Sequence, residues 1–229
     1  MRINKYIADS GFCSRRKADS LITEGRVTFN GKKAKLGDQA NIDDVIKIDG
    51  KQISIEGKQD IFLAFNKPVG VISTMDPQAD NSIIDYIDIG QRVFYVGRLD
   101  VASSGLMLLT NNGDVANKVT KSDREHEKEY IVKVSKKLTR GFLDNLRSGV
   151  VILGRKTKPA RAKKMTDTKF KIIITEGRNR QIRRMCEKLG YQVVSLKRVR
   201  IANIKLGTLG EGNSRKLTKN ERRDLLEAL

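Results

Sequence analysis

Histidine and cysteine are almost absent from this sequence of 229 residues, which contains one histidine and two cysteines. A metal site built from several histidines is therefore excluded, and a Ser-His-Asp triad could rest only on His126. Cys13 and Cys186 lie far apart in the sequence and do not indicate a disulfide framework. Walker and dinucleotide-binding motifs are missing as well. We therefore expect neither a metal nor a cofactor.

Long apolar runs, lipidation signals and the apolar segment of a secretory signal are also missing. On these grounds we expect a cytoplasmic protein that makes no membrane contact. No apolar stripe indicates a subunit interface, and we expect a monomer.

What the chain has in excess is positive charge. Lysine and arginine number 46 against 27 acidic residues, which gives a net charge of +19. A field of this size attracts polyanions, and nucleic acid is the expected partner. A generally basic soluble protein is the alternative, but the charge is unevenly distributed. Between Arg161 and Lys205, fourteen cations face three carboxylates, so more than half of the net charge lies in one fifth of the chain.

The first quarter of the chain reads as two short helices followed by small strands. Apolar residues at helical spacing start at Ile3, and Gly11 ends that helix. Ser14 is placed as the N-cap of a second helix that runs to about Glu24. Asn-Gly and Asp-Gly turns predict two hairpins, Val27–Phe29 with Lys32–Lys35 and Val45–Ile48 with Gln52–Ile55. We place an N-terminal domain at residues 1–56 and a polar linker at 57–60.

Residues 61–229 mix strands and helices, and we expect an α+β domain with a largely antiparallel mixed sheet flanked by helices. The predicted strands are Ile61–Phe65, Val93–Val96, Gly105–Leu109, Tyr130–Val134, Phe170–Thr175 and Gln192–Leu196. The predicted helices are Asp114–Thr120, Thr139–Arg147, Asn179–Leu189 and a C-terminal helix that follows a capping box at Thr218 and Glu221.

The N-terminal segment is a candidate surface for RNA. Nine cations stand against three carboxylates in its first 35 residues, and few aromatic residues lie among them, which favours recognition of a folded backbone over base stacking. A solvated helix face is the alternative reading. The amino-acid sequence of this segment resembles that of the S4 RNA-binding domain, a small module of two helices and a sheet. The candidate RNA-binding residues are Arg2, Lys5, Arg15, Arg16, Lys17, Arg26, Lys32 and Lys33.

Two further segments stand out. The string Val96-Gly-Arg98-Leu-Asp100 leaves an apolar strand and enters a polar turn, which exposes a carboxylate at the rim of a sheet. Taken alone, Asp100 reads as a turn residue or a salt-bridge partner. Four arginines open a helix between Arg178 and Arg184, where they oppose the helix dipole. An anionic ligand or a carboxylate partner would supply the energetic reason for that cluster.

Together these strings resemble the ribosomal-RNA pseudouridine synthases of the RsuA type, which carry an S4 domain ahead of the catalytic domain. Asn66-Lys-Pro-Val-Gly70 is similar to the family's first motif, Val96–Asp100 to its catalytic loop and Lys128-Glu-Tyr130 to the strand that bears its tyrosine. The segment Asn179–Glu187 resembles its basic helix, and Ser195–Arg198 resembles its C-terminal strand. The segments His126–Tyr130 and Asn179–Glu187 most resemble those of the RluF-like branch of the family, which modifies large-subunit (23S) rRNA.

The resemblance implies roles for individual residues. Asp100 is the essential carboxylate, Arg183 pairs with it, and Tyr130 packs against the target uracil. Leu196 walls the pocket, and Arg98 contacts the RNA backbone or fills the space that the flipped base leaves. The remaining candidates for substrate binding are Leu99, Arg178, Arg180 and Arg184.

The implied reaction breaks the N1–C1′ bond of a flipped uridine, turns the base and rejoins it through C5. Flipping costs a few kcal/mol, which a basic surface can offset. The carboxylate either attacks C1′ or assists loss of the base by taking a sugar proton, and the sequence leaves both routes open. It also leaves open which uridine is modified, the same chemistry on tRNA, and a binding or assembly protein without activity.

Overall fold

The computed structural model describes residues 1–55, 57, 59–76, 78–87, 89–120 and 126–229. The chain divides into two compact units. The N-terminal unit comprises Met1–Ile61 with Ile89–Val93 and Asn111–Gly113, and the C-terminal unit comprises Phe62–Asp88, Phe94–Thr110 and Asp114–Leu229. The predicted linker at 57–60 and the end of the first domain include residues 56 and 58, which lie outside the described residues, so this boundary stays a prediction.

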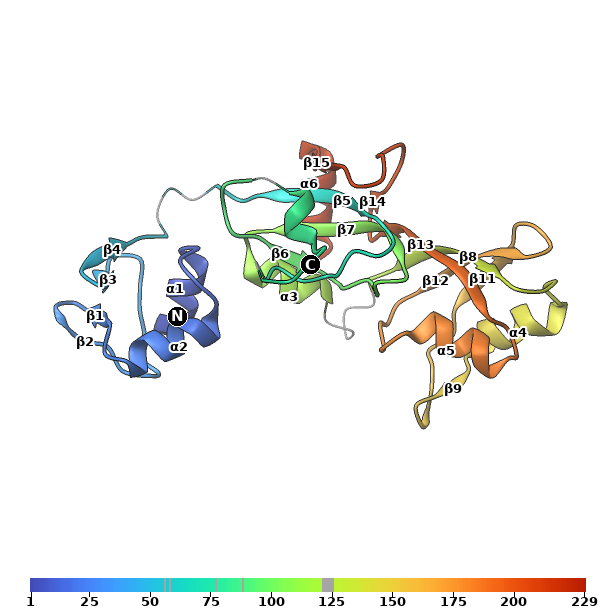
Figure 1. Ribbon diagram of the computed structural model, residues 1–229, viewed down its shortest axis with the longest axis horizontal. Helices are drawn as coiled ribbons and strands as arrows, with labels where there is room; N and C mark the ends of the chain where they lie inside the picture. Colours follow the sequence, from blue (N-terminus) through green and yellow to red (C-terminus); the bar gives the residue numbers. More distant parts are fainter. Residues whose placement is uncertain (56, 58, 77, 88, 121–125) are drawn as a thin grey trace. The chain divides into compact units, whose positions relative to one another are not determined.

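The N-terminal unit has two helices and a small antiparallel sheet (Figure 1). Helix α1 spans Ile3–Asp9 and α2 spans Arg15–Thr23, with the Ser14 side chain accepting a hydrogen bond from Lys17 N as its cap. The sheet has the order β2-β1-β3-β4, with β1 at Val27–Phe29, β2 at Lys32–Lys33, β3 at Ile46–Ile48 and β4 at Lys51–Ile53. Both predicted hairpins are therefore present.

The C-terminal unit is built around one large mixed sheet of nine strands (Figure 1). Seven strands form the main order β11-β12-β8-β13-β7-β5-β15, with β14 on β13 and β6 on β7. The pairing of β13 with β7 is parallel and the other pairings are antiparallel. The strands are β5 Phe62–Lys67, β6 Phe94–Val96, β7 Ser104–Thr110, β8 Lys128–Val134, β11 Arg161–Lys164, β12 Lys169–Ile174, β13 Val193–Ile201, β14 Ile204–Lys205 and β15 Ser214–Lys216.

The described residues of this unit also form four helices, a 3-10 turn and a small hairpin. They are η1 Ile83–Tyr86, α3 Gly113–Thr120, α4 Arg140–Ser148, the β9–β10 hairpin of Val151–Ile152 with Arg155–Lys156, α5 Gln181–Lys188 and α6 Lys219–Glu227. The capping box of α6 is confirmed, because Thr218 accepts from Glu221 N and Glu221 accepts from Thr218 N. The expected α+β class with a largely antiparallel sheet is confirmed.

An apolar core packs helices against the sheet and so fixes the strands that carry the candidate site. One cluster joins Val96 of β6, Leu106 of β7 and Ile201 of β13 with α3 and α6. Helix α4 packs on the sheet through Phe142, whose ring meets that of Phe170 edge-on at 5.4 Å. No helix among the described residues is long and apolar enough to cross a membrane.

Candidate active site

The turn that carries Asp100 connects β6 to β7. It is closed by a hydrogen bond from Ser103 N to Asp100 O of 2.9 Å. The Asp100 side chain is about one third exposed, at 34%. A carboxylate thus stands partly in solvent on the turn between β6 and β7, where a substrate could reach it.

The loop that follows β5 holds this turn in place through hydrogen bonds from Gly70 and Ser73. Gly70 N donates to Val101 O at 2.8 Å. Ser73 Oγ donates to Leu99 O at 2.6 Å, and Leu99 N donates back to Ser73 Oγ at 3.2 Å. The first-motif loop therefore holds the backbone on both sides of Asp100. Sequence reasoning missed Ser73, and no signal in its neighbourhood marks this serine.

Arg198 also holds the turn, through hydrogen bonds to backbone carbonyls. This arginine is 1% exposed, and it donates from Nε to Leu106 O at 2.6 Å and from Nη2 to Gly97 O at 2.8 Å. It therefore joins β7 to the segment just before Asp100. Sequence reasoning missed its role, although Arg198 closes the string that resembles the C-terminal strand of the family.

Arg180 and Arg183 bring positive charge to Asp100 from the start of α5. The ion pair runs from Arg180 Nη1 to Asp100 Oδ2 at 4.0 Å. Arg180 is the residue before α5 and has left-handed backbone angles, φ 50° and ψ 34°. A non-glycine residue in that region is strained, so the fold stores energy where this guanidinium meets the carboxylate.

Arg183 does not pair directly with Asp100, which corrects the prediction. Its Nη2 donates to Ala102 O at 2.7 Å, and Nη1 donates to Val193 O at 3.3 Å. Burial lowers the pKa of Arg183, the charge of Arg180 lowers it further, and Asp100 opposes both. The physical reason for the difference is that the turn offers a closer carbonyl. Arg183 therefore acts on Asp100 through its field and through the backbone of the turn.

Lys67 is a further cation near the carboxylate. It is fully buried at the end of β5, and its Nζ donates to Pro68 O at 2.6 Å and Val71 O at 2.8 Å. Burial lowers the pKa of Lys67 to about 8, and the negative charge of Asp100 opposes that shift. The lysine of the first motif thus holds its own loop together beside the site.

Tyr130 and Leu196 occupy one buried face of the sheet. In the register of β8 and β13, Tyr130 lies opposite Arg198 and Leu196 lies opposite Val132. Both are 7% exposed. Because Arg198 holds the backbone that leads to Asp100, this pairing links the strand of Tyr130 to the turn that carries Asp100.

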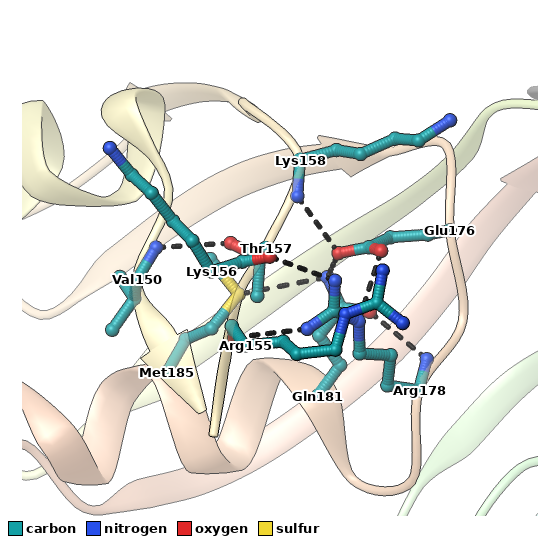
Figure 2. A network of polar contacts seen from close by, with 9 residues as sticks. All are labelled: Val150, Arg155, Lys156, Thr157, Lys158, Glu176, Arg178, Gln181 and Met185. Carbon is teal, nitrogen blue, oxygen red and sulfur yellow. Dashed lines mark hydrogen bonds and ion pairs between the residues drawn. The ribbon is translucent and has the colours of Figure 1, made fainter. Parts of the chain in front are cut away.

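Arg178 is a structural arginine (Figure 2). Its guanidinium donates from Nε to Glu176 Oε2 at 3.1 Å and from Nη1 and Nη2 to the carbonyl oxygens of Arg155 and Lys156 at 3.0 and 2.8 Å. Glu176 also accepts from Gln181 Nε2 at 2.9 Å. Three of the five N–H donors of Arg178 thus fasten the β9–β10 hairpin to the start of α5, and its role in substrate binding stays a prediction.

The other candidate substrate-binding residues differ in how far their side chains are exposed and free to contact a ligand. The Arg98 side chain is exposed, whereas Leu99 is buried. Arg184 folds back and donates to Asn179 O at 3.1 Å and Asn179 Oδ1 at 3.0 Å. Arg98 and Arg180 are thus the candidates with a guanidinium most open to a ligand.

Comparison with known proteins decides the family. A family model described as RNA pseudouridylate synthase matches residues 61–188, and an S4 domain model matches residues 1–46. The chain belongs to the RNA pseudouridylate synthase family. The resemblance drawn from the sequence is confirmed, including its N-terminal S4 domain.

Individual members of the family agree over the whole chain. The dual-specificity RNA pseudouridine synthase RluF of Escherichia coli K12 is 45% identical over 230 residues, which cover 100% of this chain and 79% of the relative. The ribosomal large subunit pseudouridine synthase B of Bacillus subtilis is 39% identical, with 96% and 93% covered. A crystal structure of a pseudouridylate synthase matches with a TM-score of 0.72 at 29% identity and covers 98% of this chain and 99% of the other.

The S4 domain of this family member presents most of its candidate RNA-binding cations to solvent. Arg2, Arg15, Arg16, Lys17, Lys32 and Lys33 are exposed. The other two candidates are ion-paired within the unit: Lys5 with Asp9 at 2.7 Å, and Arg26 with Asp49 at 2.6 Å. An RNA phosphate would have to compete for those two cations.

The described part of the chain contains no group of three or more histidine, cysteine, aspartate or glutamate residues that could hold a metal ion.

Proposed function

We propose that this protein isomerises a uridine of large-subunit ribosomal RNA to pseudouridine, with Asp100 as the catalytic carboxylate. The observation that carries the proposal is the position of Asp100. Its side chain is partly exposed on a turn held by Ser73, Gly70 and Arg198, and it faces the charge of Arg180. The names of the relatives, one of them a ribosomal large subunit enzyme, support the choice of substrate.

The arrangement suits a carboxylate that must react with a sugar. Arg180 Nη1 lies 4.0 Å from Asp100 Oδ2, and the contacts of Ser73, Gly70 and Arg198 hold the backbone of the turn that carries this carboxylate. Once the uridine has left its stack, this carboxylate attacks C1′ or takes a sugar proton, and the N1–C1′ bond breaks with its electron pair going to the base. The base turns and bonds to C1′ through C5, as the carboxylate leaves C1′ or the proton returns to the sugar. C5 then loses its proton and N1 gains one, so nothing is added or lost overall. Tyr130 and Leu196 line the buried side of the site in this proposal, and Arg98 holds the RNA beside the flipped nucleotide.

The wider proposal concerns the setting of the reaction. The S4 domain holds structured RNA, the boundary between the two domains lies at residues 57–60, and the protein works as a monomer in the cytoplasm, where ribosomal RNA is its substrate. The same chemistry on tRNA is a second candidate, because the RluF relatives are named dual-specificity RNA enzymes.

The test is the substitution Asp100→Asn. It keeps the shape of the side chain and removes its charge, so we expect uridine isomerisation to be abolished and RNA affinity to stay within about twofold. Pseudouridine is measured by mass spectrometry of digested rRNA and tRNA transcripts. Asp144→Asn changes an exposed carboxylate on α4 and is the matched control. A wild-type protein that forms no pseudouridine in any of these RNAs would favour a binding protein without activity.

A further inference from the structure

The sheet of the C-terminal unit has a face opposite to the one that carries Tyr130. Side chains alternate along a strand, and Tyr130, Ile172 and Leu196 point into the buried side. Helix α4 covers that side through Phe142, and Figure 1 shows α4 and α5 on one side of these strands. The neighbouring positions of β8, β11, β12 and β13 therefore point the other way, onto what we name the far face.

The far face is strongly basic. Its cations are Lys133, Arg161, Lys163, Lys169, Lys171, Lys197 and Arg200. One row runs across four adjacent strands, with Lys163 opposite Lys171, Lys171 opposite Ile131 and Ile131 opposite Lys197. Such a row spans about 14 Å at the usual spacing of strands. The positive charge is thus spread over a broad surface.

Carboxylates neutralise only part of this surface. Glu129 pairs with Lys171 at 2.8 Å and with Arg200 at 2.9 Å, and Glu127 pairs with Arg200 and Arg161. The other four cations have no ion pair with a carboxylate of the described residues; they are Lys133, Lys163, Lys169 and Lys197.

The register places two pairs of lysines directly opposite each other. Lys163 faces Lys171 across β11 and β12, and Lys169 faces Lys133 across β12 and β8. Like charges in directly opposed positions destabilise a sheet. A face that only had to be solvated could carry serine or threonine there without that cost. Glu129 compensates Lys171, but Lys163, Lys169 and Lys133 have no carboxylate partner among the described residues, and an anion that lies across the face would offset their repulsion.

We propose that the far face binds the phosphate backbone of the substrate RNA at a second place, away from the target uridine. The charge of the face is complementary to phosphate, and its strand positions carry no aromatic ring on which a base could stack, so the contact is with backbone and independent of sequence. The inference rests on RNA being the substrate, as proposed above.

The test neutralises the four cations that lack an ion pair: Lys133→Gln, Lys163→Gln, Lys169→Gln and Lys197→Gln in one variant. The matched control neutralises four exposed lysines outside the far face, Lys118, Lys205, Lys216 and Lys219, also to glutamine. Both variants lose four charges, so a general effect of net charge is the same in each. Affinity for a full-length 23S rRNA transcript is measured as a function of salt, and thermal unfolding checks that both variants fold.

We expect the slope of log affinity against log salt to become shallower by about 3 in the far-face variant, since each lost phosphate contact removes about 0.7–0.9. The double variant Lys133→Gln with Lys163→Gln should lose about half of that. The deficit should disappear when the transcript is shortened to the target stem-loop. Equal slopes in far-face and control variants, or a deficit that persists on the shortest bound RNA, would overturn the inference. Pseudouridine formation by the wild type in the same transcript is scored separately, so a failure of the proposed function is recognised as such.

Discussion

Gly105 offers the most direct test of how the sheet supports the catalytic turn. It lies at the start of β7, opposite Arg198 in the parallel pairing with β13. A Cβ atom placed on Gly105 would lie 2.7 Å from Arg198 N and closer still to Arg198 O. Its φ of +105° is also one that residues with a side chain rarely adopt. The substitution Gly105→Ala therefore brings both a clash with backbone and a strained conformation.

The expected cost follows from these two effects. Strain at such a backbone position is worth about 1–3 kcal/mol, and overpacking is worth about 1–3 kcal/mol. Together they give roughly 2–6 kcal/mol, against a total stability of about 5–15 kcal/mol for a typical protein. Because Arg198 holds Gly97 O, displacement of β13 should also move the turn. A misplacement of about 1 Å can cost about 100-fold in rate, and we expect a loss of that order.

The assay is urea unfolding followed by circular dichroism, together with kcat/KM for pseudouridine formation. Gly141→Ala is the matched control, because Gly141 lies in α4 with nothing within 4 Å of an added Cβ. A glycine inside a helix costs about 0.5–1 kcal/mol relative to alanine, so the control should be slightly stabilised. If Gly105→Ala unfolds within about 0.5 kcal/mol of the wild type, the close approach of β7 and β13 does not constrain this site and the reasoning is wrong.

Three further predictions concern buried polar groups. Arg178→Ala leaves the buried Glu176 without its arginine and should destabilise the protein by about 1–3 kcal/mol in urea unfolding; an unchanged midpoint would contradict the network of Figure 2. Because burial lowers the pKa of Lys67 to about 8 from 10.5, the unfolded chain binds the extra proton between these pH values, and wild-type stability should rise there with pH. Relative to Lys67→Met, the rise should reach about 3 kcal/mol, and parallel pH curves of the two proteins would contradict it. Burial raises the pKa of the Cys186 thiol to about 12, so in a Cys13→Ser variant Ellman's reagent should find a reactive thiol only after denaturant is added.

The local signals in the sequence were sufficient for most elements. Ser14 and Thr218 each cap the helix predicted to follow it, since a side-chain oxygen before an apolar period satisfies free backbone donors. The Asn-Gly and Asp-Gly pairs form the predicted hairpin turns because Asn30 and Asp49 each adopt a positive φ of 49°. Such short-range rules need no knowledge of the tertiary fold.

Strands defined only by their neighbours were not predicted. Residues Arg161–Lys164 form β11, yet only Ala162 of the four is buried, so no alternation of apolar residues marks them. The strand exists because β12 offers it a register. Gln192–Leu196 was predicted too short for the same reason: β13 continues to Ile201 by pairing with β8 past a bulge.

The contacts of the arginine cluster could not be predicted from the sequence. The sequence placed four guanidinium groups near the start of α5, but it does not say which acceptor each one finds. Arg178 reaches carbonyls of the β9–β10 hairpin, and Arg184 folds onto Asn179. Arg180 faces Asp100 because its left-handed backbone delays the helix to Gln181. These outcomes depend on loop geometry, which a spacing rule cannot supply.

The way in which cations surround Asp100 has a consequence for the reaction. A carboxylate that accepts two short hydrogen bonds from one arginine has its orientation fixed by that arginine. Here Arg183 donates to Ala102 O instead, and Arg180 Nη1 stays 4.0 Å from Asp100 Oδ2. At that distance the guanidinium brings positive charge to the carboxylate without a short hydrogen bond to its oxygen atoms. In the mechanism proposed above, the backbone contacts that hold the turn therefore orient Asp100, and the arginines supply positive charge beside it.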